Sequence, residues 1–386
     1  MDIKSYSKIL FKNLIQNTIS NYRYKGRVKN YIRYYSKIVA KNPELRKPAD
    51  GEKEWLDRWR KYDKSLSPLS YRIFSRFVGE AINIMPLELC LNIVEPILNP
   101  DAYRGFYRNK NSLNLIIPEE MTVKTIIRKI AGFFYNSCYE PIAITDANLK
   151  CMFGSYDKVL FKPAMEDSGR GIALFRKKGD VFVNDNGGDE LNVNYLNNLK
   201  LDDFQIQVYI EQSAFTADFN PSSVNSFRIM TYRSIKTGEI HVPNLYFKIG
   251  GKNQVVDNSH GGGIMCGVDN NGRLLHYTYN YLGETFINCF DKNMVCETYI
   301  VPNYEGLISF AKEVAKHIVH HHLLALDIAL DKNNNPVLIE INSEAFSGWG
   351  YQMSTGSIFK EYTCEVMEYC FHRMQGLKHL KKCEFS

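Results

Sequence analysis

Two adjoining apolar segments near the C-terminal end constrain the fold of this chain more than any other feature. LLALDIAL (residues 323–330) and PVLIEIN (residues 336–342) are short apolar runs typical of β-strands, in which Asp327, Glu340 and Asn342 are the polar residues, and DKNNN separates them. We expect a hairpin with a two-residue turn at Asn333 and Asn334, because asparagine tolerates the positive φ angles that such turns require. In this register Asp327 pairs with Glu340.

The predicted register gathers oxygen atoms on one face of the hairpin. Asp327 and Glu340 would form a pair without backbone hydrogen bonds, with Cα atoms about 4.5 Å apart, and Asn342 follows on the same face. Opposed carboxylates repel each other unless a cation lies between them. Mg²⁺ prefers such oxygen ligands and is often completed by phosphates. The hairpin therefore predicts a magnesium site; the alternative is a solvent-facing strand pair with incidental acids.

A second feature is a loop of small residues between two apolar strands. The stretch KVLFKPAMEDSGRGIALFRK places Lys162 at the end of the first strand, with Gly169 and Gly171 in the loop. Glycine lets backbone N–H groups approach phosphate oxygens closely, and the lysine adds positive charge. The pattern matches neither the P-loop nor the dinucleotide-binding motif. An anion-binding loop and an ordinary hairpin loop both remain open.

Composition indicates a globular, reducing-compartment protein. Of 386 residues, 45% are hydrophobic and 23% are charged, which is typical of a folded domain. Nine scattered cysteines without a C-x-x-C motif favour reduced thiols and a cytoplasmic location. We expect neither a membrane span nor a signal peptide, because apolar runs are short and polar residues interrupt the first twenty positions.

Positive charge is concentrated at the N-terminal end. Residues 1–50 contain 12 lysines and arginines against 3 acids, although the whole chain carries only +6. This region is a candidate contact for an anionic partner, such as the inner face of a membrane or a lipid-linked glycan. The alternative is a solvated helix face. Nucleic acid is not expected as a partner, because no reading motif accompanies the charge.

The order of elements indicates an α+β fold. Residues 3–40 and 53–94 have helical periodicity, short β-rich runs begin at Lys158, and helical patterns return at residues 304–322 and 358–374. The run VLFKP with its loop, then FQIQVYIEQ, then LDIALD with PVLIEIN, resembles the ATP-grasp fold. More narrowly, NKNSLNLIIPE, SSVNSFRIMTYRS, VVDNSHGGGIMCGVD and EIN followed by GYQ resemble the sugar-transfer-associated ATP-grasp family of bacterial polysaccharide biosynthesis.

This resemblance covers about residues 103–375 and implies two α+β lobes that grip ATP. Helical periodicity predicts a helical N-terminal region at 1–100, which the family motifs do not explain. The resemblance implies a first ATP-grasp lobe with a glycine-rich lid at 101–205 and a second lobe with the Mg²⁺ site at 206–386.

The resemblance also implies roles for individual residues. The implied catalytic residues are Arg228, Lys162 and Lys110. The implied nucleotide contacts are Lys110, Lys162, Ser168, Gly169, Arg170, Gly171, Gln207, Tyr209, Ile210 and Glu211. The implied Mg²⁺ ligands are Asp327, Glu340 and Asn342. The candidate substrate contacts are Arg228, Lys248, Asp257, Asn258, His260, Gly262, Trp349 and Gln352. For the aromatic Trp349, core packing is the alternative.

The implied activity is an ATP-dependent carboxylate–amine ligase that works through an acyl phosphate. Its cofactors would be ATP and Mg²⁺, and its substrates a carboxylate-bearing sugar or glycan and an amino acid or other amine. A glycosyltransferase is one alternative, although Asp327 and Asp331 would lie about 13 Å apart on a strand, too far to share one ion. A non-catalytic nucleotide-binding protein is another. A zinc site at His317, His320, His321 and His322 lacks a suitably spaced third ligand.

Overall fold

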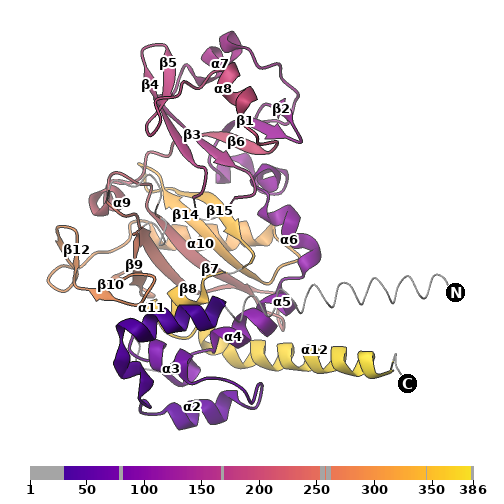
Figure 1. The fold of residues 1–386 in the computed structure, drawn as a ribbon, viewed down its shortest axis with the longest axis vertical. Helices are drawn as coiled ribbons and strands as arrows, with labels where there is room; N and C mark the ends of the chain where they lie inside the picture. Colours follow the sequence, from indigo (N-terminus) through magenta and orange to yellow (C-terminus); the bar gives the residue numbers. More distant parts are fainter. Residues whose placement is uncertain are drawn as a thin grey trace, which may run out of the picture. The chain divides into compact units, whose positions relative to one another are not determined.

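The chain separates into two compact units in a computed structural model that describes residues 30–77, 81–166, 169–252, 257, 262–344 and 346–383 (Figure 1). The first unit joins residues 1–98 to residues 356–386, and the second spans Asn99–Thr355. The expected lobe boundary at residue 205 falls inside the second unit and stays a prediction. Within the described residues, no helix is long and apolar enough to cross a membrane.

The first unit is helical wherever the structure describes it. Residues 30–41 form a helix. The further elements are η1 (Pro43–Arg46), α2 (Glu52–Trp59), α3 (Leu69–Phe74), η2 (Ala81–Asn83), α4 (Leu87–Leu89), the π-helical turn η3 (Cys90–Val94), α5 (Glu95–Leu98), η7 (Lys360–Tyr362) and α12 (Thr363–Cys383). Trp55 and Trp59, one turn apart on α2, are fully buried, and the Trp55 indole donates a 2.7 Å hydrogen bond to the Ile84 carbonyl oxygen. Val366 and Met367 of α12 are also buried, so both ends of the chain build this unit.

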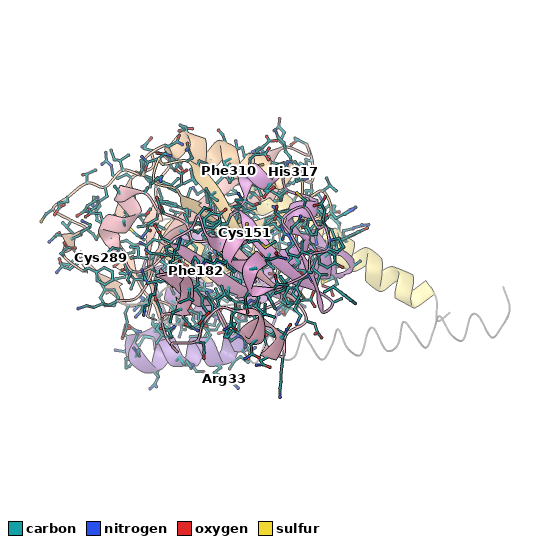
Figure 2. The ribbon with its side chains drawn as sticks, turned by 90° about the horizontal axis from the view of Figure 1, so that it is seen from above. Arg33, Cys151, Phe182, Cys289, Phe310 and His317 are labelled. Atoms are coloured by element: carbon teal, nitrogen blue, oxygen red, sulfur yellow. The ribbon has the colours of Figure 1, made fainter. Side chains whose placement is uncertain are left out.

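The second unit begins with α6 (Asp101–Arg108), η4 (Lys110–Leu115) and η5 (Glu119–Met121) and then forms an antiparallel six-stranded sheet. Its strands are β1 (Thr125–Ile130), β2 (Phe133–Tyr135), β3 (Lys158–Pro163), β4 (Ala173–Lys178), β5 (Val181–Asn184) and β6 (Phe204–Val208), in the order β2-β1-β6-β3-β4-β5. Helices α7 (Asp146–Phe153) and α8 (Val193–Asn198) contribute to the core on one face. Phe182, labelled in Figure 2, packs edge-on against Phe153 of α7 in this core.

A seven-stranded antiparallel sheet follows, in the order β11-β10-β9-β8-β7-β14-β15. The strands are β7 (Ser226–Arg233), β8 (Ile240–Ile249), β9 (Ile264–Val268), β10 (Leu274–Tyr279), β11 (Thr285–Phe286), β14 (Leu323–Leu330) and β15 (Pro336–Asn342). The remaining elements are α9 (Ala214–Phe219), the small hairpin of β12 (Asn288–Cys289) and β13 (Lys292–Asn293), α10 (Tyr304–Lys316) and α11 (Gly348–Ser354). Phe227, Leu326 and Ile328 share the core with Leu307 of α10, whereas alternate positions carry polar side chains on the other face.

The expected hairpin forms between β14 and β15, and Asp327 pairs with Glu340 as predicted. The predicted two-residue turn is wrong. Asp331 and Asn335 close a three-residue loop with Asn334 at φ +63°, and the Asp331 carboxylate accepts from the backbone N–H groups of Asn333 and Asn335. This loop shifts the register by one residue, and a bulge between Leu338 and Glu340 shifts it back.

Candidate active site

One transverse row of side chains crosses the polar face of the seven-stranded sheet. Tyr246 on β8 pairs with Arg228 on β7, Arg228 pairs with Asp327 on β14, and Asp327 pairs with Glu340 on β15. Directly paired residues of adjacent strands point to the same face, so the four side chains lie side by side. The sheet register, set by apolar residues on the other face, therefore fixes the order of charges in the site.

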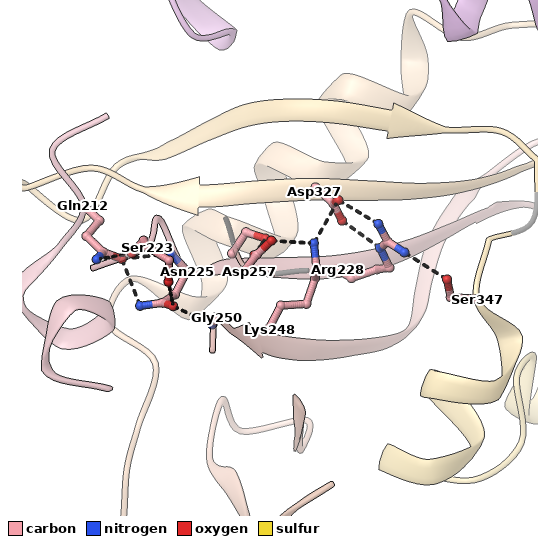
Figure 3. A network of polar contacts seen from close by, with 10 residues as sticks. Gln212, Ser223, Asn225, Arg228, Lys248, Gly250, Asp257, Asp327 and Ser347 are labelled. Carbon is pink, nitrogen blue, oxygen red and sulfur yellow. Dashed lines mark hydrogen bonds and ion pairs between the residues drawn. The ribbon is translucent and has the colours of Figure 1, made fainter. Parts of the chain in front are cut away.

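Asp327 is the centre of a charge network (Figure 3). Its two carboxylate oxygens accept from Arg228 Nε and Nη2, each at 2.7 Å, and Lys248 Nζ lies 3.2 Å from Oδ2. Burial alone would raise the pKa of Asp327, but Arg228 and Lys248 together hold that pKa well below its usual range. This carboxylate is therefore ionised at every physiological pH, as a ligand for a cation must be.

Lys248 joins this network to the segment that follows β8. Its ammonium lies 2.9 Å from Asp257 Oδ1, and the hydroxyl of Ser226 donates to the other Asp257 oxygen. Burial lowers the pKa of Lys248, but the charges of Asp257 and Asp327 outweigh it and leave the pKa raised. Lys248 therefore stays positive between two carboxylates. Gly262 lies near the start of β9 with φ +90°, and the candidate contacts Asn258 and His260 fall outside the described residues.

The two candidate phosphate lysines lie beside Glu340. Lys110 begins η4, and its Nζ lies 3.2 Å from Glu340 Oε1 and donates at 2.7 Å to the Glu166 carbonyl oxygen. Lys162 is buried on β3, where burial lowers its pKa to about 8, the charge of Glu340 opposes that shift and the charge of Lys110 adds to it. The six-stranded sheet thus contributes the cation of Lys162 to the site, and the seven-stranded sheet contributes the carboxylate of Glu340.

The glycine-rich loop connects β3 to β4 as an antiparallel hairpin. Gly169 and Gly171 adopt φ of +71° and +72°, the left-handed region that favours glycine. A side chain on Gly171 would place Cβ 2.9 Å from the Pro163 ring. Arg170 is exposed beside Glu166, at 3.2 Å. Ser168, the remaining predicted lid contact, lies outside the described residues.

Four of the predicted nucleotide contacts, Gln207, Tyr209, Ile210 and Glu211, lie on β6 or directly after it. Gln207 is buried on this strand, where its amide nitrogen donates to Thr125 Oγ1 at 3.2 Å. Tyr209 lies under the Lys158 ammonium, 5.3 Å from the ring centre, and Ile210 is half-buried. Glu211 points instead to Lys332, at 2.8 Å on the surface. Their roles in nucleotide binding stay predictions.

The remaining predicted residues lie on α11 and at the end of β15. Trp349 and Gln352 are buried in α11, and Trp349 packs edge-on against Tyr281, 4.9 Å between ring centres. Asn342 lies two residues beyond Glu340 on β15, and no hydrogen-bond partner for its amide nitrogen occurs among the described residues. That part of the chain also contains no cluster of three or more His, Cys, Asp or Glu side chains able to hold a metal. His320 stacks on Tyr103, 3.8 Å between ring centres.

Two residues beside Arg228 were not predicted. Tyr246 is fully buried beside Arg228, and the alternation of PNLYFKI around Lys248 could have placed it on the same face. Ser347, whose hydroxyl accepts from Arg228 Nη1 at 2.9 Å, has no signal in the sequence, because only the turn after β15 brings it there.

Comparison with known proteins identifies the family of the chain. Residues 105–367 match the family model described as sugar-transfer associated ATP-grasp. The chain belongs to the sugar-transfer associated ATP-grasp family. This assignment confirms the predicted family and fold. No protein with a curated description matches the chain.

Several solved structures are similar to the chain at low sequence identity. An L-amino acid ligase from Bacillus licheniformis is 14% identical, covering 68% of this chain and 47% of its own, with a TM-score of 0.33. The biotin carboxylase domain of Hydrogenobacter thermophilus 2-oxoglutarate carboxylase, a complex with MgADP, ADP and bicarbonate, is 14% identical, covering 68% and 46%, with a TM-score of 0.40. D-alanyl-alanine synthetase A from Vibrio cholerae is 12% identical, covering 71% and 66%, with a TM-score of 0.37. The chain spans about half the length of the first two proteins.

Proposed function

We propose that this protein is an ATP-dependent ligase that joins an amino acid or another amine to a carboxylate-bearing sugar or glycan. One observation carries the proposal: Lys110 of η4 and Lys162 of the six-stranded sheet lie beside Glu340, and Arg228 and Asp327 occupy the same row of the seven-stranded sheet as Glu340. Family membership supports the reaction class and its place in surface polysaccharide synthesis.

In the proposed reaction, a substrate carboxylate oxygen attacks the γ-phosphorus of ATP, and the bond to the leaving ADP oxygen breaks. The amine then attacks the acyl carbon, inorganic phosphate leaves, and the amine gives up a proton. Lys110, Lys162 and Arg228 neutralise charge on the phosphoryl oxygens during the first step. Closure of the loop around Gly169 and Gly171 excludes water, which would hydrolyse the acyl phosphate.

The residues present suit magnesium. Asp327 and Glu340 are paired carboxylates, Asn342 adds an amide oxygen, and hard oxygen donors are what Mg²⁺ prefers. These three residues would hold the ion, which supplies charge neutralisation at the β- and γ-phosphates when bound.

The direct test incubates the protein with ATP, Mg²⁺ and a matrix of uronic acids and amines, and measures ADP release and the mass of the amide product. ADP and amide should form together for at least one pair and require Mg²⁺. Lys162→Ala and Glu340→Gln should each lower kcat/KM by about 10²- to 10³-fold, because each removes a charge that stabilises the transition state.

Near-normal turnover in either variant would show that the site is misassigned. Stabilisation by Mg-ATP without ADP release for any pair would instead indicate a non-catalytic nucleotide-binding protein. Hydrolysis of a nucleotide sugar would indicate a transferase.

We also propose a cytoplasmic location, with the basic N-terminal region as the contact with the inner membrane face. Much of that charge belongs to residues 1–29, which lie outside the described residues. Sedimentation of the full chain with anionic vesicles, compared with neutral vesicles, tests the contact.

A further inference from the structure

Ser347 has a backbone conformation that side-chain-bearing residues rarely adopt. Its φ of +66° and ψ of +44° are left-handed, a region where an L-residue is strained. The residue precedes α11, but its side chain makes no capping hydrogen bond to that helix. Helix capping therefore does not explain why serine, rather than glycine, stands at this position.

The hydroxyl of Ser347 completes a three-point attachment of Arg228 (Figure 3). Nε and Nη2 of Arg228 donate to the two oxygens of Asp327, and Nη1 donates to Ser347 Oγ at 2.9 Å. A bidentate pair alone leaves the guanidinium free to rock about the carboxylate. A third bond, from a residue outside the sheet, fixes the guanidinium plane and the direction of its remaining N–H groups.

Packing of α11 maintains the strained residue in place. The backbone N–H of Gly350 donates at 2.8 Å to the Ser347 carbonyl oxygen. A Cβ on Gly350 would lie 2.9 Å from the Tyr246 ring, so the helix approaches the sheet closely at this point. Tyr246 itself is paired with Arg228. The helix that presents Ser347 and the arginine that it contacts are therefore held by the same tyrosine.

We propose that Ser347 is a positioning residue, which holds Arg228 so that its guanidinium faces the phosphoryl group that is being transferred. This inference rests on the proposed function, which gives Arg228 its role. It explains the strain, because glycine would relieve the backbone but lose the hydroxyl.

The test compares Ser347→Gly, which relieves the strain and removes the acceptor, with Ser347→Asn, which keeps an acceptor and tolerates positive φ. Two affinities of the full chain are measured by calorimetry: the affinity for MgADP alone, and the affinity for MgADP with aluminium fluoride, an analogue of the phosphoryl group in the transition state. Thermal unfolding of each variant is measured in parallel.

In Ser347→Gly we expect an unchanged affinity for MgADP, an affinity about tenfold weaker for the aluminium fluoride complex, and an unfolding midpoint at or above that of the wild type. Ser347→Asn should restore most of the lost affinity. Where turnover is measurable, kcat should fall and KM for ATP should not change.

Equal affinities of Ser347→Gly and the wild type for the aluminium fluoride complex would overturn the inference. So would an equal loss for both ligands with a lower unfolding midpoint, since that pattern indicates a structural role. A wild-type protein that does not bind MgADP at all would overturn the proposed function itself, and this inference with it.

Discussion

At the scale of single residues, Lys162 gives the site a sensitivity to alkaline pH. Burial lowers its pKa to about 8, well below the ordinary value of a lysine. In the proposed site, the folded protein would present a neutral amine to the phosphates of ATP above that pH. In the unfolded chain Lys162 keeps its proton up to about pH 10.4. Between about pH 8 and pH 10.4 only the unfolded chain holds this proton, so the free energy of unfolding rises with pH over this range, while nucleotide binding should weaken.

We therefore predict that kcat/KM for ATP falls above about pH 8, because this parameter reports the free enzyme. Lys162→Arg should abolish the alkaline decline, since arginine stays charged. Lys177→Arg, a lysine exposed on β4, is the matched control and should keep the wild-type profile. A decline that persists in Lys162→Arg would assign the titration to another group.

Asp327 should contribute to stability as well as to the site. Replacing it with asparagine leaves Arg228 and Lys248 buried near each other without the shared carboxylate. Removing one partner of a buried charge pair costs about 3–5 kcal/mol. We expect Asp327→Asn to lower the thermal unfolding midpoint at pH 7 by an amount that corresponds to this loss.

The pH dependence of that loss has a definite sign. The folded pKa of Asp327 is depressed, so its stabilisation is fully present above the unfolded value of about 3.9 and is lost as the pH falls toward the folded value. The difference between wild type and Asp327→Asn should therefore be constant from about pH 5 to pH 8 and shrink below about pH 4. A difference that grows in acid would contradict this assignment.

At the scale of elements, the sequence predicted strands better than turns. The apolar alternation of β3, β7, β14 and β15 identified these strands, because one face of each must pack against a core. The three-residue loop and the bulge beside Glu340 were missed, because DKNNN suits more than one turn and a bulge leaves no apolar signature. The two irregularities cancel, so the pairing of Asp327 with Glu340 was nevertheless correct.

Gly171, in the loop between β3 and β4, and Gly188, which follows β5, allow a matched comparison. Gly171 and Gly188 both adopt φ of +72°, but only a Cβ on Gly171 would meet a neighbour, the Pro163 ring at 2.9 Å. Gly188→Ala should cost about 1–2 kcal/mol through its backbone alone. Gly171→Ala should cost about 1 kcal/mol more, because the rigid proline must move.

Pro163 follows Lys162 directly, so Gly171→Ala should also disturb the proposed nucleotide site. We expect Gly171→Ala to raise KM for ATP severalfold, whereas Gly188→Ala leaves it unchanged. Unfolding midpoints and steady-state kinetics of the two variants provide the measurements. Identical effects of both substitutions would mean that the close approach to Pro163 has no role.

At the scale of the whole molecule, the sequence predicted the helical and mixed regions but not which helices belong together. We grouped the pattern at residues 358–374 with the second lobe, whereas α12 lies in the first unit with residues from the other end of the chain. An apolar helix face, such as that of Val366, Met367 and Cys370, indicates that a partner exists without identifying it. Site residues from distant segments could be grouped in the sequence analysis only because the resemblance to a known family supplied their arrangement.

This organisation predicts how the chain can be divided. Asn99 anchors the beginning of the second unit, since its amide nitrogen donates to the carbonyl oxygens of Leu323 and Ser343 at 2.6 and 2.8 Å. A fragment of residues 99–355 should therefore fold and be stabilised by Mg-ATP, because it contains both sheets and every described residue of the candidate site.

A longer fragment, residues 99–386, should aggregate more readily than the fragment of residues 99–355. It keeps α12 but lacks the N-terminal helices of the first unit, so the apolar side chains of Val366 and Met367 lose their cover. We expect this fragment to aggregate, as judged by size-exclusion chromatography, while the shorter one elutes as a single species with a cooperative thermal transition. A well-behaved longer fragment alongside an unfolded shorter one would show that α12 supports the second unit, and that the division of the chain at Thr355 does not describe how it folds.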